Sequence, residues 1–289
     1  MRVLNNFWKR IVTVLSVGLV IFQLYTTAFG VFSDLIQRSI HMGFVLSLCF
    51  ILKPVKKNMT ENQRGSIPFY DIFLSIIAIA STVYICVHSS EITWTPLKWY
   101  GILDIFFSVA LTFMIIEAAR RTVGWTFPIM ACLFLFYAYY GEIFPGIWGH
   151  KRFGISLILQ TFYHTTNGIW GTMIGISATI LAMFSVFAAV LGETGGSETF
   201  VKIGKKLTGR LTGGTAKMSL ISDALFGMIS GSAMANVVGT GVFTIPMMKK
   251  SGFPSKWAAA FEAVGSTGGQ IMPPIMGSAA FIMAQIISK

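Results

Sequence analysis

Charged residues are scarce in this 289-residue sequence. Only 11% of the residues are Asp, Glu, Lys or Arg, whereas 54% are hydrophobic, and the mean hydropathy is +0.70. A soluble globular domain usually has about 25% charged residues. The lack of charge therefore excludes a water-soluble protein and indicates one that lies in a lipid bilayer.

Cysteine and histidine are equally sparse, and their positions exclude several kinds of chemistry. The three cysteines, Cys49, Cys86 and Cys132, stand singly inside hydrophobic runs, without the spacing of a zinc site or disulfide framework. The four histidines show no metal-ligand spacing either: His41, His88, His150 and His164. An intramembrane enzyme needs a nucleophile paired with a base, or a metal-binding cluster. Neither is visible, so we expect no enzyme, no catalytic residue and no cofactor.

Long runs without charge make up most of the chain: 11–33, 72–90, 122–141 and the forty residues 153–192. About 20 apolar residues are needed to cross roughly 30 Å of hydrocarbon as a helix. The runs and their flanks predict an all-α membrane protein with spans over about 11–32, 36–52, 71–88, 101–118, 122–141 and 172–191.

The net charge of +11 comes from short basic clusters between these runs. Such clusters mark the cytoplasmic side of a membrane protein, and a nucleic-acid-binding protein would instead have a continuous basic domain. They predict a multi-pass protein of the bacterial inner membrane, in contact with lipid, with a cytoplasmic N-terminus and no nucleic-acid partner. The clusters are Arg2, Lys9 and Arg10; Lys53, Lys56, Lys57 and Arg64; Arg120 and Arg121; Lys202 to Lys217; and Lys249 to Lys256.

Residues 1–121 have the pattern of a scaffold of four ordinary helices. Asp104 is the only acidic residue well inside one of its predicted spans, about one turn from the outer end, where a carboxylate can still reach water. We expect a structural or interfacial role for it. Residues 122–217 follow with two spans and a basic amphipathic segment, which is typical of a helix on the cytoplasmic membrane surface.

Residues 218–289 hold two apolar segments that are interrupted in the middle. The first has basic residues on both flanks, Lys217 before it and Lys249 and Lys250 after it, so both its ends favour the cytoplasm. It is too short for two full spans. It therefore predicts a re-entrant hairpin with its tip near 230–236, which is tolerated only where protein or a cavity surrounds the irregular backbone.

The second segment, 258–288, is interrupted by glycines and by Pro273 and Pro274 within the stretch 265–274. Proline lacks an amide hydrogen and disfavours the helical conformation of the preceding residue. We expect a discontinuous helix whose freed carbonyls, with Ser and Thr hydroxyls, suit a small hard cation such as sodium, and whose half-helix N-termini suit a carboxylate.

Plainer interpretations exist for the same residues. The stretch 265–274 could be a polar turn, and Ser232 and Asn236 could serve only close helix packing, because Gly227, Gly231 and Ala235 recur at every fourth position. Asp223 and Glu262 could be helix caps, surface charges or residues of ion or substrate coupling. Gln270 could satisfy freed backbone groups or contact substrate.

The segments 231–246 and 262–277 carry a resemblance to a known family. GSAMANVVGTGVFTIP and EAVGSTGGQIMPPIMG are similar to motifs in the membrane part of tripartite ATP-independent periplasmic (TRAP) transporters. The four-helix start resembles permeases in which small and large membrane subunits are fused, as found with TAXI-type binding proteins.

The resemblance implies sodium symport of small organic acids, delivered by a TAXI-type periplasmic solute-binding protein. It places the first sodium site on Ser232, Asn236, Gly265, Thr267 and Met272, with Gln270 and Pro273 as tentative substrate contacts. It also makes 1–121 a small-subunit-like scaffold and 218–289 the first of two inverted transport repeats.

The family pairs this first repeat with an inverted second copy, and the sequence reaches Lys289 before such a copy starts. A truncated product, a fragment or one piece of a split permease would each have this pattern, and alone we expect the chain not to transport. A non-transporting membrane scaffold or interaction subunit is the alternative function. No arginine lies in the predicted membrane interior, so dicarboxylates, oxo acids and amino acids all stay open as substrates.

Overall fold

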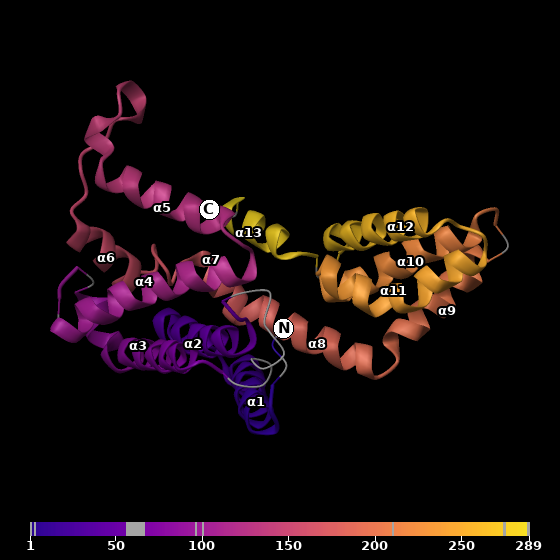
Figure 1. Ribbon diagram of the computed structural model, residues 1–289, viewed down its shortest axis with the longest axis horizontal. Coiled ribbons are helices and arrows are strands. Elements are labelled where there is room, and N and C mark those ends of the chain that lie inside the picture. The colour runs from indigo at the N-terminus through magenta and orange to yellow at the C-terminus, as the bar shows by residue number, and fades with distance from the viewer. Residues whose placement is uncertain are drawn as a thin grey trace. The chain divides into compact units, whose positions relative to one another are not determined.

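The computed structural model describes the whole chain except residues 1, 3, 56–66, 96, 100, 210, 274–275 and 288–289 (Figure 1). The described part contains helices and no strand, so the predicted all-α fold is confirmed. The basic loop residues Lys56, Lys57 and Arg64 and the interrupting Pro274 lie outside the described residues. The chain divides into two compact units, unit 1 (Met1–Ala178) and unit 2 (Thr179–Lys289). This division falls within the predicted segment 122–217.

Unit 1 starts with four apolar helices that are each long enough to cross a membrane. They are α1 (Asn6–Phe29), α2 (Asp34–Leu52), α3 (Phe69–Trp94) and α4 (Ile102–Thr122). A fifth candidate span, Thr172–Glu193, consists of α7 (Thr172–Ile176), the π-helical turn η4 (Ser177–Leu181) and α8 (Ala182–Glu193). Long apolar sequences fold as helices in lipid because every backbone polar group must find its partner within the segment.

The span predicted over 122–141 is shorter than expected. Only α5 (Thr126–Tyr139) is helical there, and 14 residues rise about 21 Å, less than the hydrocarbon thickness. The chain then turns back through η2 (Gly141–Ile143) and η3 (Gly146–Trp148), where His150 N donates to Gly141 O at 3.1 Å. The short helix α6 (Ile155–His164) follows.

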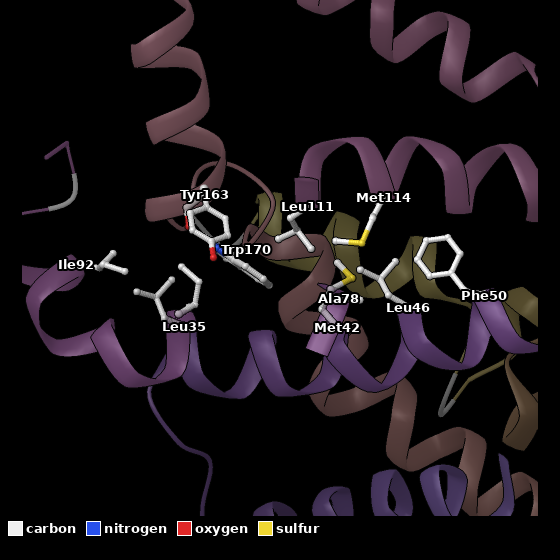
Figure 2. Packing of buried hydrophobic residues seen from close by; sticks show 11 residues of the cluster. Leu35, Met42, Leu46, Phe50, Ala78, Ile92, Leu111, Met114, Tyr163 and Trp170 are labelled. Carbon is white, nitrogen blue, oxygen red and sulfur yellow. The ribbon is translucent and has the colours of Figure 1, made fainter. Parts of the chain in front are cut away.

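The core of unit 1 is a row of buried side chains between α2, α3, α4 and α6 (Figure 2). Four of them come from one face of α2, at intervals of seven and four residues: Leu35, Met42, Leu46 and Phe50. This spacing repeats a single helix face, so α2 presents a continuous apolar stripe to its neighbours. The indole Nε1 of buried Trp170 donates to Tyr163 O at 2.6 Å, which joins the loop after α6 to this core.

Buried charges in unit 1 are paired with opposite charges. Asp71, fully buried at the start of α3, accepts from Arg2 Nη2 and from Arg121 Nη1, both at 2.6 Å. Arg121 Nε and Arg120 Nη2 both donate to Glu117 Oε1 at 2.7 Å. This network joins the chain before α1 to the start of α3 and the end of α4, so these helix ends lie together.

Asp104 does not reach water as predicted. It is fully buried in α4, and its Oδ1 lies 2.7 Å from Nε2 of the buried His164 in α6. No role was predicted for His164, because the two residues lie 60 positions apart and come together only through the packing of α4 and α6.

Unit 2 is built from α8, α9 (Gly196–Thr208), α10 (Gly214–Ser230), α11 (Ala233–Lys250), α12 (Ser255–Gly268), η5 (Gly269–Ile271) and α13 (Ser278–Ile287). Figure 1 shows α10, α11 and α12 packed side by side, and α10 contacts α9, α11 and α12. In α9, Lys202, Lys205 and Lys206 are exposed, while Val201 and Gly204 are buried. The helix that was predicted to lie on the membrane surface therefore also packs against α10.

Candidate functional site

The first interrupted segment folds as two helices joined by a two-residue connection. Gly231 ends α10 in the left-handed conformation, with φ of 57°, which glycine adopts without steric cost. Ser232 then begins α11 as its N-cap, and its Oγ accepts from Ala235 N at 3.3 Å. The bend lies within the predicted tip region 230–236.

The second interrupted segment keeps its helix longer than predicted. Helix α12 continues through Gly265 to Gly268, and η5 extends the helical path to Ile271. The break begins at Met272, whose backbone is extended, and α13 begins at Ser278. Pro273 stands at the start of this break, because proline cannot continue the helical hydrogen bonds; the glycines before it are tolerated in the helix.

The bend and the break lie together at the end of α10. A side chain at Gly227 would collide with the backbone of Gly269, and a Cβ on Gly277 would lie 3.2 Å from Gly231 O. Inside the break, Gly277 N donates to Gln270 O at 2.5 Å. Small residues therefore let α10, η5 and the segment before α13 approach closely.

The predicted cation ligands lie on different sides of this junction. Asn236 is fully buried and donates through Nδ2 to Asp223 O at 2.8 Å. Gly265 is packed directly against Asp223 Oδ2. Thr267 is exposed and donates to Ala263 O at 2.7 Å. Ser232 and Met272 are half-buried. Asn236 and Gly265 thus face α10, and the Thr267 hydroxyl does not.

The tentative substrate residues border the break, where Gln270 is half-buried and Pro273 exposed. A separate groove of about 780 Å³ opens beside the bend, between α8, α9, α10 and α11. Its walls are mostly small and apolar residues, with the polar side chains of Ser230, Ser232, Glu193 and Glu198 among them. This volume is in the range of sites for small molecules.

Asp223 and Glu262 are neither caps nor surface charges, since both are almost completely buried, at 0% and 1% exposure. Thr240 Oγ1 lies 2.6 Å from Asp223 Oδ1 and 3.0 Å from Glu262 Oε1. Ser219 Oγ lies 3.4 Å from Asp223 Oδ2 and 3.0 Å from Glu262 Oε2, and Thr244 Oγ1 donates to Glu262 Oε2 at 2.5 Å. We call Asp223, Glu262, Ser219, Thr240 and Thr244 the carboxylate cluster.

The sequence contains a pattern from which this cluster could have been predicted. Polar residues recur at every fourth position of otherwise apolar helices: Ser219 and Asp223 in α10; Asn236, Thr240 and Thr244 in α11; Glu262 and Ser266 in α12. Residues four apart lie on one helix face. Three such stripes indicate a polar interior among three helices, and only the tertiary packing shows that the stripes face one another.

The cluster and its surroundings offer oxygen donors alone, which suit a hard cation. No group of three or more His, Cys, Asp and Glu side chains in the described ranges is arranged to hold a metal ion. A transition metal, in contrast, prefers nitrogen and sulfur ligands.

Comparisons with known proteins point to one family. A family model described as "Tripartite ATP-independent periplasmic transporter, DctM component" matches residues 110–289. The C4-dicarboxylate TRAP transporter large permease protein DctM of Vibrio cholerae is 29% identical over 153 residues, which cover 50% of this chain and 34% of that protein. The 2,3-diketo-L-gulonate TRAP transporter large permease protein YiaN of Escherichia coli is 31% identical over 124 residues, which cover 42% and 27%.

A third relative, the uncharacterized protein YgiK of Salmonella typhimurium, is 34% identical over 98 residues, which cover 33% of this chain and 22% of the relative. The matched region thus spans about a third or less of the length of these curated relatives. No solved structure matches the chain.

Proposed function

Because the chain belongs to the DctM-component family of tripartite ATP-independent periplasmic transporters, we propose that it forms part of a sodium-coupled permease that imports small organic acids. The family consists of transport permeases rather than enzymes. Together with the apolar helices of this chain, membership of the family makes it a multi-pass protein of the inner membrane. The matched residues 110–289 include all of unit 2.

The observation that carries the proposal is the buried polar junction in unit 2. A bent hairpin and an interrupted helix meet at the end of α10, with the buried Asn236 amide and two carboxylates beside them. Burying polar groups in a membrane helix bundle costs free energy, so such groups mark ion and substrate pathways. Discontinuous helices that meet inside a membrane are the usual place for coupling ions and substrates in secondary transporters.

The groove beside the bend has the volume for a small organic acid, which would have to bind away from the acidic side chains of Glu193 and Glu198. The N-terminus of α11 and the hydroxyls of Ser230 and Ser232 lie at one wall, and a helix N-terminus attracts a carboxylate. The relatives described above are named for C4-dicarboxylate and 2,3-diketo-L-gulonate, which supports an acid as the substrate class. Gln270 and Pro273 at the break stay our tentative substrate contacts, and a TAXI-type periplasmic binding protein is the proposed donor.

The orientation proposed has the N-terminus in the cytoplasm. The salt-bridge network of Arg2, Asp71 and Arg121 supports it, since these residues stand at helix ends that share one side of the bundle. Basic residues on one side of a membrane bundle favour the cytoplasm.

Uptake of radiolabelled acids into proteoliposomes tests the proposal, with the complete permease that contains this chain and its periplasmic binding protein. Uptake should require an inward sodium gradient and should be lost in Asn236→Ala, whose side chain is buried at the junction. Thr267→Ala is the matched control, because its exposed hydroxyl donates only to its own helix. Sodium-indifferent uptake would refute the sodium coupling, and no uptake of any acid would favour a scaffold or interaction subunit.

A further inference from the structure

Unit 1 contains an apolar groove of about 600 Å³ between α4, α5 and α6. Ile115 of α4, Leu135 of α5 and Ile158 of α6 are on its walls, and none of the described residues that line it is charged. The volume is in the range of sites for small molecules. Walls of this kind favour an apolar molecule, or the apolar part of an amphiphilic one, because burying a charge without a partner costs free energy.

The groove lies at the depth of the lipid bilayer. Helix α5 begins at Thr126, shortly after the basic pair Arg120 and Arg121, which marks one membrane surface. Its 14 residues rise about 21 Å, less than the roughly 30 Å of hydrocarbon, so the loop after α5 reaches the opposite headgroup region at most. The surface of this loop is apolar, with Ile147 95% and Trp148 67% exposed. Its surroundings are therefore lipid rather than bulk water.

The loop after α5 folds back so that two basic residues adjoin one end of the groove. Phe153 N donates to Ala138 O at 3.3 Å, and both of these residues line the groove. Lys151 and Arg152 directly precede Phe153. The Cζ atom of Arg152 lies 4.0 Å from the centre of the Tyr139 ring, a cation–π contact. This contact holds the guanidinium beside the residue that follows Ala138, at the end of the groove.

The two basic side chains have no acidic partner in the described part of the chain. Neither Lys151 nor Arg152 takes part in a salt bridge there, and both are exposed. Glu142 Oε1 accepts from the backbone N of Arg152 at 3.4 Å, so the guanidinium keeps its charge unpaired. Basic residues at a membrane surface attract anionic headgroups, and arginine binds phosphate through two parallel hydrogen bonds. The charge at this end of the groove is therefore complementary to a phosphate.

We propose that this groove of unit 1 binds an anionic phospholipid, with one acyl chain between α4, α5 and α6 and with the phosphate held by Lys151 and Arg152. A zwitterionic lipid has the same chains but brings a positive headgroup to the basic pair, so it binds more weakly. Helix α5 contacts α4, and the groove separates it from α6. A bound chain fills this space and stabilises the position of α5. The site is independent of the sodium coupling and of the transported acid.

Native mass spectrometry of the full 289-residue chain in detergent tests the headgroup, with dioleoylphosphatidylglycerol and dioleoylphosphatidylcholine titrated separately. The wild-type chain should bind phosphatidylglycerol about 25-fold more tightly, since each basic residue near an anionic headgroup contributes a factor of about five. Lys151→Gln and Arg152→Gln should each lose about fivefold of this preference, and Arg152→Lys, which keeps the charge, should keep most of it. Arg10→Gln is the matched control, because Arg10 is an exposed basic residue of α1 that does not line the groove.

Ala131→Trp tests the part of the site that holds the acyl chain. Ala131 lines the groove on α5, so an indole there takes the space of several CH₂ groups of the chain. Both lipids should bind at least about tenfold more weakly, since each buried CH₂ contributes about fourfold to the affinity. Cys132→Trp is the matched control, because Cys132 is the next residue of α5, is exposed and is not among the lining residues. Thermal unfolding without added lipid shows whether each variant folds.

Several outcomes would overturn the lipid site. Equal affinities of the wild-type chain for the two lipids, or an unchanged preference in Lys151→Gln and Arg152→Gln, would mean that lipid binds without recognition by the basic pair. Equal binding by Ala131→Trp and Cys132→Trp would place the acyl chain outside the groove. If sn-glycerol 3-phosphate competes with phosphatidylglycerol at equal concentration, the basic pair binds a free anion and not a lipid. None of these results bears on sodium-dependent uptake, so the proposed function would stand.

Discussion

Unit 1 and unit 2 bury carboxylates in opposite ways. In unit 1, Asp71 is bound by two arginines and Asp104 faces His164. In unit 2, Asp223 and Glu262 face each other through shared hydroxyls. A carboxylate that is bound by a basic side chain of the fold makes a closed structural contact. The two acidic side chains of unit 2 instead share neutral hydroxyl donors from α10 and α11. The comparison therefore separates a unit whose buried acids have basic partners from one whose buried acids are held by neutral donors.

The largest effect should come from breaking the charge network of unit 1. Asp71→Asn leaves Arg2 and Arg121 buried without their carboxylate, and removing one partner of a buried ion pair costs about 3–5 kcal/mol. The measurement is the free energy of unfolding in SDS-containing mixed micelles, which should be independent of sodium.

Asp34→Asn is the control for this change. Asp34 pairs with Arg38 at 2.8 Å, but its side chain is 67% exposed, so its loss should change the free energy of unfolding by less than about 1 kcal/mol. Equal losses in the two variants would show that burial does not decide the strength of these pairs.

Asp104→Asn should have the next largest effect. The variant keeps the shape of the side chain and removes the charge that faces His164 at 2.7 Å, and hydrogen bonds to charged groups contribute about 1.5–3 kcal/mol. The same unfolding assay, with and without sodium, should show a loss of about 2 kcal/mol in both. A loss that appears only in sodium would contradict the assignment of His164 as the partner of Asp104.

Gly227→Ala tests the close contact of the bend with the break in unit 2. Its Cβ would collide with the backbone of Gly269, and overpacking of this kind costs about 1–3 kcal/mol. Gly268→Ala is the control, because its Cβ would meet nothing within 4 Å and alanine favours a helix by up to about 1 kcal/mol. Thermal unfolding should show a lower midpoint only for Gly227→Ala. Equal midpoints would mean that α10 and η5 do not touch as described.

The smallest effect, of opposite sign, should come from Glu262→Gln. The variant replaces one of two neighbouring buried carboxyl groups and adds an amide donor beside the hydroxyls that they share, so we expect a gain of about 1 kcal/mol in the free energy of unfolding. A loss as large as that of Asp71→Asn would remove the contrast between the units.

The sequence predicted the interrupted segments well because proline, glycine and basic flanks act locally. The bend at Gly231 and Ser232 lies in the predicted tip region, and the break begins at Met272, next to the predicted Pro273. The glycines misled the prediction at Gly265, where the helix continues, because glycine weakens a helix but does not remove a hydrogen bond as proline does. The span predicted over 122–141 was too long for another reason. A stretch without charged residues permits a long helix but does not require one.

The partners of buried polar residues could not be predicted. Thr240 lies 22 residues from Glu262, and His164 lies 60 residues from Asp104. A helical stripe shows which residues share a face, but the rotation of each helix depends on the packing of all its neighbours. For this reason Asp223 and Glu262 could be helix caps, surface charges or coupling residues until α10, α11 and α12 were seen together.

The sequence by itself determined that this protein lies in a membrane, that it is helical and that its C-terminal quarter contains a bent hairpin and an interrupted helix. Hydropathy, basic flanks and proline could predict these features because each acts within a single helix or its ends. Tertiary structure alone decided that Thr267 faces outward, that Asn236 contacts Asp223 and that two carboxylates share their hydroxyls. The physical reason is that burial and charge pairing depend on which helix faces meet, and those faces are set by contacts between residues that are distant in sequence.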